Sequence, residues 1–338
     1  MFKDTVQAAL PEFQKDLGLR VNHSNLCSEI TLATNNERTA VCCLSSVNLE
    51  EYDEWKDNLD FIPDLIRMLD NVITHFCDTA PPELEKAVNS AKSERSLGLG
   101  AMGFHAYLQR HNVPFESAMA KGRNIKMFKH IKGEALNATR QLAKERGSCP
   151  DGSSAGVRNA HLLAVAPNAS SSIICGNTSP SIEPYRANAF TQKTKSGSSL
   201  LKNEYLEHAL QELGQDTDDV WKSIITNGGS VQHLDFLDEW TKEIFKTAVE
   251  IDQRWVIEMA ADRQEDICQS QSLNIFFPSN VSKQELHAIH MMAWKKKVKT
   301  LYYLRSEAMK RAENVSDEVL RQYIFDSMDE EGCLACEG

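Results

Sequence analysis

The sequence predicts a mixed α/β fold, in which a shell of helices surrounds a buried sheet or barrel of short strands. Long stretches of the chain repeat apolar residues every three or four positions, which is the spacing of an amphipathic helix. Between them lie short apolar runs rich in residues that favour strands. Strands separated by long helices typically form a sheet on which the helices pack. At 338 residues the chain can bury a sizeable core as one large unit.

The expected elements follow one another along the chain without an internal repeat or an obvious linker. The expected strands cover residues 25–31, 39–44, 161–166, 172–175, 272–277 and 298–304. The expected helices cover residues 59–76, 125–142, 201–213 and 235–264, and Gly147 is a suitable end for the second of them. From residue 326 the sequence is acidic and rich in small residues, which indicates a mobile tail. We therefore expect one domain over 1–325 and a tail over 326–338.

Charge and composition exclude several classes of function. A formal net charge of −11 argues against non-specific nucleic-acid binding, which needs a basic face. No apolar run approaches the roughly 20 residues that span a bilayer, and the start MFKDTVQAALPEF does not resemble a signal peptide. The chain is therefore expected in the cytoplasm, with neither a nucleic acid nor a membrane as partner.

The chain has nine cysteines, an odd number that fits a secreted disulfide framework poorly. In a reducing compartment they indicate thiol chemistry or metal binding. A structural zinc site needs four ligands in two closely spaced pairs. Here one pair, Cys42 and Cys43, is adjacent and the other, Cys333 and Cys336, is near the end of the chain. We expect no metal site.

Asn25, Cys27 and Glu29 alternate along the first expected strand, which would place all three on one face. A thiol, a carboxylate and an amide this close could perform hydrogen-atom transfer, base catalysis and hydroxyl binding. Spacing alone nevertheless favours a plainer interpretation, a half-exposed strand with scattered polar side chains.

Three further motifs are weak when taken alone. Tyr302 and Tyr303 follow a basic amphipathic segment and could simply belong to a strand. Residues 164–173 run from an apolar stretch into a hydroxyl-rich turn, which suits a phosphate but usually only solvates itself. Residues 98–103 spell GxGxxG, but polar residues precede them instead of a buried strand, so a dinucleotide site is not expected.

The motifs taken together resemble a known family. NLCSEI at residues 25–30, followed by VCCLSSVNL at 41–49, is similar to the active-site stretch of class I ribonucleotide reductase large subunits. TLYY at 300–303 and a terminal cysteine pair occur in the family's order, and the likeness runs from about residue 24 to 336. It implies the later strands and the finger loop of a ten-stranded α/β barrel. It also implies reduction of ribonucleoside diphosphates to 2′-deoxy diphosphates.

The resemblance also implies roles for individual residues. Cys27 would become a thiyl radical and take the 3′-hydrogen of the substrate, Glu29 would remove the 3′-hydroxyl proton, and Asn25 would hold the ribose hydroxyls. By its place before LSSVNL, Cys42 would be one of two cysteines that reduce the 2′ carbon, while Cys43 would point into the core.

The remaining motifs gain functions from the same resemblance. Tyr303 would receive a radical and Tyr302 would pass it to Cys27. The substrate diphosphate would lie on Asn168, Ala169, Ser170, Ser171 and Ser172. Cys333 and Cys336 would swing in to reduce the active-site disulfide and would themselves be reduced by thioredoxin or glutaredoxin. The glycines at 98–103 would permit close packing.

The resemblance implies partners as well. The radical would come from a small subunit that contains a metal, and this chain would bind no cofactor directly. In the family, the redox partner of Cys42 lies well upstream of the radical cysteine, but only 26 residues precede Cys27 and none is a cysteine. We therefore expect a companion chain with the N-terminal half, as in a split gene, or else a truncated chain. The alternatives are a non-catalytic remnant that binds a reductase or thioredoxin, and an anaerobic glycyl-radical enzyme.

Overall fold

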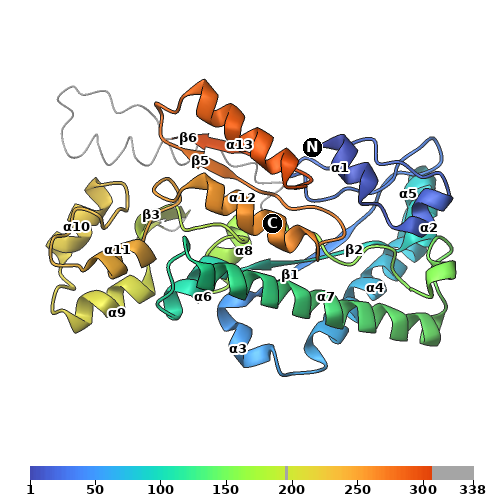
Figure 1. Cartoon of the computed structure of the whole chain (residues 1–338). Helices are drawn as coiled ribbons and strands as arrows, with labels where there is room; N and C mark the ends of the chain where they lie inside the picture. The colour runs from blue at the N-terminus through green and yellow to red at the C-terminus, as the bar shows by residue number, and fades with distance from the viewer. Residues whose placement is uncertain (195–196, 307–338) are drawn as a thin grey trace.

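The computed structural model describes residues 1–194 and 197–306. Its α-helices, shown in Figure 1, are α1 (Lys3–Ala8), α2 (Glu12–Asp16), α3 (Tyr52–Trp55), α4 (Phe61–Thr79), α5 (Glu85–Glu94), α6 (Phe104–Arg110), α7 (Ala118–Arg146), α8 (Ala169–Ile174), α9 (Glu204–Glu212), α10 (Asp218–Thr226), α11 (Glu239–Ile244), α12 (Gln253–Gln264) and α13 (Lys283–Lys295). Short 3-10 helices are η1 (Leu49–Glu51), η2 (Pro82–Leu84) and η3 (Ser153–Ala155). The strands are β1 (Cys43–Asn48), β2 (Leu97–Met102), β3 (Ala189–Thr194), β4 (Gly197–Lys202), β5 (Ile275–Phe277) and β6 (Leu304–Ser306).

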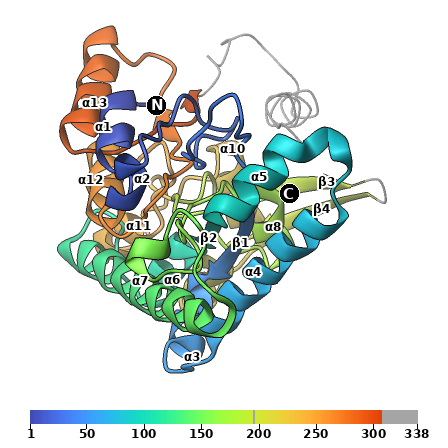
Figure 2. The same ribbon diagram turned by 90° about the vertical axis from the view of Figure 1, so that its right-hand side faces the viewer.

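Parallel extended segments form the interior of the molecule. β1 pairs in parallel with β2 along its whole length. A parallel bridge joins Leu99 of β2 to Leu163, and a second joins Val165 to Gln271. The segment that contains Gln271 leads into β5, which pairs in parallel with β6. Segments far apart in the sequence thus lie side by side, with helices outside them, as Figure 2 shows for β1 and β2.

Helix α4 covers the central strands from outside. Its buried residues Ile62, Ile66, Leu69 and Ile73 recur every three or four positions, so they form one face. The helix packs on β1, β2 and α7. The predictions of helices over 59–76 and 125–142 are confirmed, and Gly147 ends α7 with a φ of 84°. That conformation is open to glycine at little cost.

Five of the other predicted elements were wrong in type or in extent. Residues 25–31 form a turn, and residues 172–175 belong largely to helix α8 and its end. The predicted helix 235–264 is broken into α11 and α12, since Asp252 caps α12 by accepting from the Arg254 N–H. The predicted helix 201–213 begins only after β4, where the Asn203 side chain caps α9. The strand expected at 39–44 begins at Cys43.

Helices α9, α10 and α11 surround a second, smaller core beside the central one (Figure 1). Leu206, Trp221, Ile224 and Ile244 are among its buried side chains. Across the described part of the chain, no helix is both long and apolar enough to cross a membrane.

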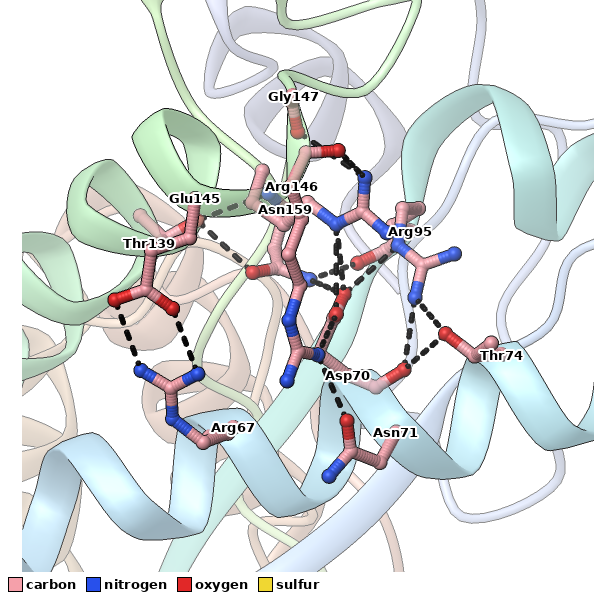
Figure 3. Close-up of polar contacts among 11 residues, drawn as sticks. Arg67, Asp70, Asn71, Thr74, Arg95, Thr139, Glu145, Arg146, Gly147 and Asn159 are labelled. Atoms are coloured by element: carbon pink, nitrogen blue, oxygen red, sulfur yellow. Dashed lines mark hydrogen bonds and ion pairs between the residues drawn. The ribbon is translucent and has the colours of Figure 1, made fainter.

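A buried ion cluster ties the helical shell to the start of β2. Figure 3 shows the Asp70 carboxylate of α4 facing Arg95, Arg146 and Asn159. Arg95 Nε donates to Asp70 at 2.7 Å, and Arg146 Nη1 donates to it at 3.0 Å from the end of α7. Burial by itself raises the pKa of Asp70, but hydrogen bonds and positive charge, mainly from Arg95, outweigh burial and lower that pKa. The cluster fixes Arg95 two residues before β2.

Candidate active site

Cys27 lies in a turn, and this corrects the expected strand. The Asn25 carbonyl accepts from the Ser28 N–H at 3.2 Å, and the Asn25 side-chain oxygen accepts from the Ile30 N–H at 3.0 Å. Ser28 has a φ of 64°, in the left-handed region that ends an extended run. Asn25 is exposed, whereas Cys27 and Glu29 are 3% and 2% exposed. The three side chains therefore do not share one strand face.

Cys27 contacts the tyrosine pair. Tyr302 Oη and Cys27 Sγ are 3.3 Å apart, within hydrogen-bonding distance for sulfur. The rings of Tyr302 and Tyr303 lie with centroids 4.0 Å apart and planes tilted by 39°. The Arg305 guanidinium lies 4.8 Å from the centre of the Tyr303 ring. Two phenols and one thiol thus form a continuous contact series from 27 to 303.

Backbone pairing sets the position of the two tyrosines. The Tyr302 N–H donates to the Leu273 carbonyl at 2.8 Å, and the Tyr303 N–H donates to the Asn274 side chain at 3.0 Å. Burial, followed by the hydrogen bond with Cys27, raises the pKa of Tyr302 above its usual value. The phenolate form of Tyr302 is therefore disfavoured.

Ser272 joins Glu29 to the Cys27 turn. Its hydroxyl oxygen lies 2.9 Å from Glu29 Oε2 and 2.6 Å from the Cys27 carbonyl oxygen. The Ser270 N–H also donates to the Glu29 carbonyl at 2.9 Å. The segment 269–272 is completely buried, so these contacts lie away from water. They tie the Glu29 carboxylate to the backbone of the turn that carries Cys27.

Cys42 lies just before β1 and contacts Gln269. Gln269 Nε2 donates to Cys42 Sγ at 3.2 Å and to the Leu97 carbonyl at 2.8 Å. The side-chain oxygen of Gln269 accepts from the Thr31 N–H at 3.2 Å, which links Cys42 to the Cys27 turn. Burial raises the pKa of Cys42 well above its usual value, and the Gln269 hydrogen bond opposes this rise.

The two adjacent cysteines pack against different groups. Cys42 packs beside Ile30, Leu32 and Ala164, while Cys43 packs against the main core. Glycine at position 98 leaves room for the Cys42 sulfur, because an added Cβ there would lie 3.0 Å from it. Gly98 and Gly100 of the GxGxxG run thus lie inside β2, where they allow close packing, while Gly103 precedes α6 with a φ of 82°.

Residues 168–172 form the start of helix α8. Asn168 has a φ of 54°, and its side-chain oxygen accepts from Ser46 Oγ of β1 at 3.1 Å. Asn168 Nδ2 donates to Ser171 Oγ at 3.2 Å, and Ser172 Oγ donates to the Ala169 carbonyl at 3.0 Å. The first N–H groups of a helix have no partner within it, so they remain available to an anion. Ser170 is half-buried in this turn.

The terminal cysteine pair and a possible metal site remain to be considered. Cys333 and Cys336 lie outside the described residues. In residues 1–194 and 197–306, no group of three or more His, Cys, Asp or Glu side chains could hold a metal ion.

The comparison with known families covers almost the whole described chain. Residues 1–153 and 150–304 match the family described as "Ribonucleotide reductase, barrel domain". The chain belongs to the ribonucleotide reductase barrel family. The family and the barrel fold that the motifs implied are confirmed.

Viral and bacterial ribonucleotide reductases are among the relatives. The chain is 48% identical to a putative ribonucleoside-diphosphate reductase large subunit of Frog virus 3 (isolate Goorha), covering 100% of this chain and 59% of the viral protein. It is 53% identical to the ribonucleoside-diphosphate reductase large subunit of Invertebrate iridescent virus 6, covering 86% of this chain and 31% of that viral protein. A solved class Id ribonucleotide reductase alpha subunit of Actinobacillus ureae superposes with a TM-score of 0.85 at 40% identity, covering 90% of this chain and 57% of that one. The chain spans less than two thirds of each of these relatives.

Two polar residues of the candidate site were not predicted. Gln269 and Ser272 lie in the run QSQS, of which only Ser272 belongs to a predicted element, the strand expected at 272–277. All four polar residues of the run are 0% exposed. Four consecutive polar residues leading into an apolar strand were the signal, because buried polar groups need specific partners.

Proposed function

We propose that this chain is the radical-carrying part of a cytoplasmic ribonucleoside-diphosphate reductase large subunit. It would convert ribonucleoside diphosphates to 2′-deoxyribonucleoside diphosphates together with a companion chain that carries the N-terminal half. The observation that supports this most directly is the 3.3 Å contact between Cys27 Sγ and Tyr302 Oη, together with the 4.0 Å separation of the Tyr302 and Tyr303 ring centroids. A cytoplasmic location agrees with the need to keep thiols reduced.

The radical would travel along this contact. An oxidised Tyr303 takes an electron and a proton from Tyr302, and Tyr302 then takes a hydrogen atom from the Cys27 thiol. Each transfer regenerates a phenol and passes the unpaired electron on, ending as a thiyl radical on Cys27. The raised pKa of Tyr302 favours this coupled transfer, because its phenolate is disfavoured.

The thiyl radical would take the 3′-hydrogen atom of the ribose, while Glu29 takes the 3′-hydroxyl proton. Asn25 would hold the ribose hydroxyls, and residues 168–172 would hold the diphosphate. Cys42 and a thiol of the companion chain would supply two electrons and two protons, so the 2′-hydroxyl leaves as water and a disulfide forms. Glu29 then returns its proton to the 3′ oxygen, and Cys27 returns its hydrogen atom to the 3′ carbon.

The proposed partners follow from what this chemistry consumes. A small subunit with a metal centre would generate the radical, and this chain would bind no cofactor of its own. The pair Cys333 and Cys336 would reduce the Cys42 disulfide by thiol exchange and would be reduced by thioredoxin or glutaredoxin.

The test is reconstitution. The chain is combined with an N-terminal half and a radical-generating small subunit, and deoxynucleotide formation is measured for wild type, Cys27→Ser and Tyr302→Phe. We expect activity in the wild-type complex and its loss in both variants, because serine and phenylalanine cannot pass the radical on. Activity that survives Cys27→Ser refutes the radical assignment. A complex that assembles but makes no deoxynucleotide supports the non-catalytic alternative.

A further inference from the structure

The Ser272 hydroxyl has one hydrogen but lies close to two acceptor oxygens, one of Glu29 and one of the Cys27 carbonyl. Ser272 Oγ lies within hydrogen-bonding distance of two oxygens, at 2.6 Å and 2.9 Å. A carbonyl oxygen and an ionised carboxylate both only accept, whereas a hydroxyl has a single hydrogen to donate. With Glu29 ionised, only one of the two contacts can therefore contain a hydrogen.

Protonation of Glu29 resolves this conflict. The acid O–H of Glu29 can donate to Ser272 Oγ, and the Ser272 hydrogen is then committed to the Cys27 carbonyl. Both short contacts become hydrogen bonds in the same direction, from Glu29 through Ser272 to the turn. With Glu29 ionised, the Ser272 hydrogen turns to the carboxylate, and two oxygens face each other across 2.6 Å.

We propose that Ser272 is a positioning residue that couples the protonation of Glu29 to the backbone of the turn that carries Cys27. This inference rests on the proposed function, in which Glu29 takes the 3′-hydroxyl proton. The proton stays on Glu29, and the Ser272 hydroxyl only rotates, so no bond of Ser272 breaks. The turn is then held most firmly after proton transfer, when Cys27 is a thiol that must return its hydrogen atom.

The surroundings suit such coupling. Ser272, Glu29 and Cys27 are 0%, 2% and 3% exposed, so water cannot easily replace a missing partner. The Ser272 N–H donates to the Val165 carbonyl at 2.8 Å, which fixes the backbone from which the hydroxyl rotates. Titratable groups on the elements packed around the pair include Cys27, Tyr302 and Glu183, and Glu183 accepts from the Asn274 N–H.

An infrared measurement on the full chain tests the coupling without enzyme activity. Subtracting the spectrum of Glu29→Gln isolates the Glu29 bands, which are recorded in acidic and in neutral solution. Ser272→Ala is expected to shift both the acid band and the carboxylate band, since Ser272 accepts from one form and donates to the other. Ser272→Thr keeps the hydroxyl and is expected to restore both bands.

A matched control is Ser270→Ala. Ser270 is also completely buried in the same segment, and its hydroxyl bonds to Thr300 Oγ1 at 2.5 Å instead of to Glu29. This variant is expected to leave both Glu29 bands in place. If Ser272→Ala leaves the bands in place, or shifts only one of them, the coupling is refuted. Should Ser272→Ala not fold, Ser272→Cys offers a weak donor and acceptor of similar shape and is judged by the same two bands.

Kinetics of the reconstituted complex separate this inference from the proposed function. Ser272→Ala is expected to lower kcat about 10- to 100-fold with little change in KM, and Ser272→Thr to recover most of it. If the wild-type complex makes no deoxynucleotide, the proposed function fails. If it is active and Ser272→Ala keeps the wild-type kcat, the inference alone fails.

Discussion

At the scale of single residues, one amide holds together two parts of the site. Gln269 donates from Nε2 to Cys42 Sγ and the Leu97 carbonyl, and its side-chain oxygen accepts from the Thr31 N–H. The Cys42 thiol and the Cys27 turn are thereby fixed relative to each other. An N–H donor also stabilises a thiolate more than a thiol, so the same contact opposes the rise in the pKa of Cys42 that burial causes.

Gln269→Met should therefore make Cys42 a poorer nucleophile. Without the N–H donor the pKa of Cys42 rises further, and the thiolate fraction at pH 8 to 9 falls. We expect native alkylation of Cys42, followed by mass spectrometry, to slow about tenfold. The control is Gln253→Met, because Gln253 is also buried and binds three backbone groups away from Cys42. An equal slowing in both variants would contradict the role given to Gln269.

Among the secondary-structure elements, the sequence correctly predicted the helices that have a long repeat of apolar residues every three or four positions. The four buried apolar residues of α4 and the glycine after α7 carry their own signals, and both helices are where the sequence places them. The break between α11 and α12 depends instead on distant groups, since Glu116 accepts from the Asp252 N–H at 2.6 Å. The Cys27 turn likewise depends on the distant Ser272. Periodicity contains no information about such contacts.

Gly100 in β2 has no room for a side chain, whereas Gly122 in α7 has open space around it. A Cβ on Gly100 would lie 2.5 Å from the Ala164 carbonyl oxygen, which is backbone and cannot rotate away. Gly100→Ala should therefore lower the free energy of unfolding by about 1 to 3 kcal/mol. Gly122→Ala in α7 is the control, because nothing lies within 4 Å of the added Cβ. It should raise that free energy by about 0.5 to 1 kcal/mol. Urea unfolding measures both, and equal signs would contradict the packing argument.

At the scale of the whole molecule, the Asp70 cluster joins the outer helices to the central strands (Figure 3). Asp70 is 0% exposed and bonds to arginines at the end of α5, at the end of α7 and at position 158. Three guanidinium groups thus share one buried carboxylate. Removing the carboxylate would leave these positive charges close together without their counter-ion, which is more costly than losing one exposed pair.

Asp70→Asn should therefore lower the free energy of unfolding by about 3 to 5 kcal/mol at pH 7. Because the folded-state pKa of Asp70 is lowered, its stabilisation is present above the unfolded pKa of about 3.9 and is lost as pH falls through the folded value. The difference between wild type and Asp70→Asn should accordingly narrow below about pH 4. Glu145→Gln, which breaks the half-exposed pair with Arg67, is the control and should change stability far less. Denaturant unfolding across pH decides the matter, and a difference that widens toward acid would show that Asp70 does not stabilise the fold as a carboxylate.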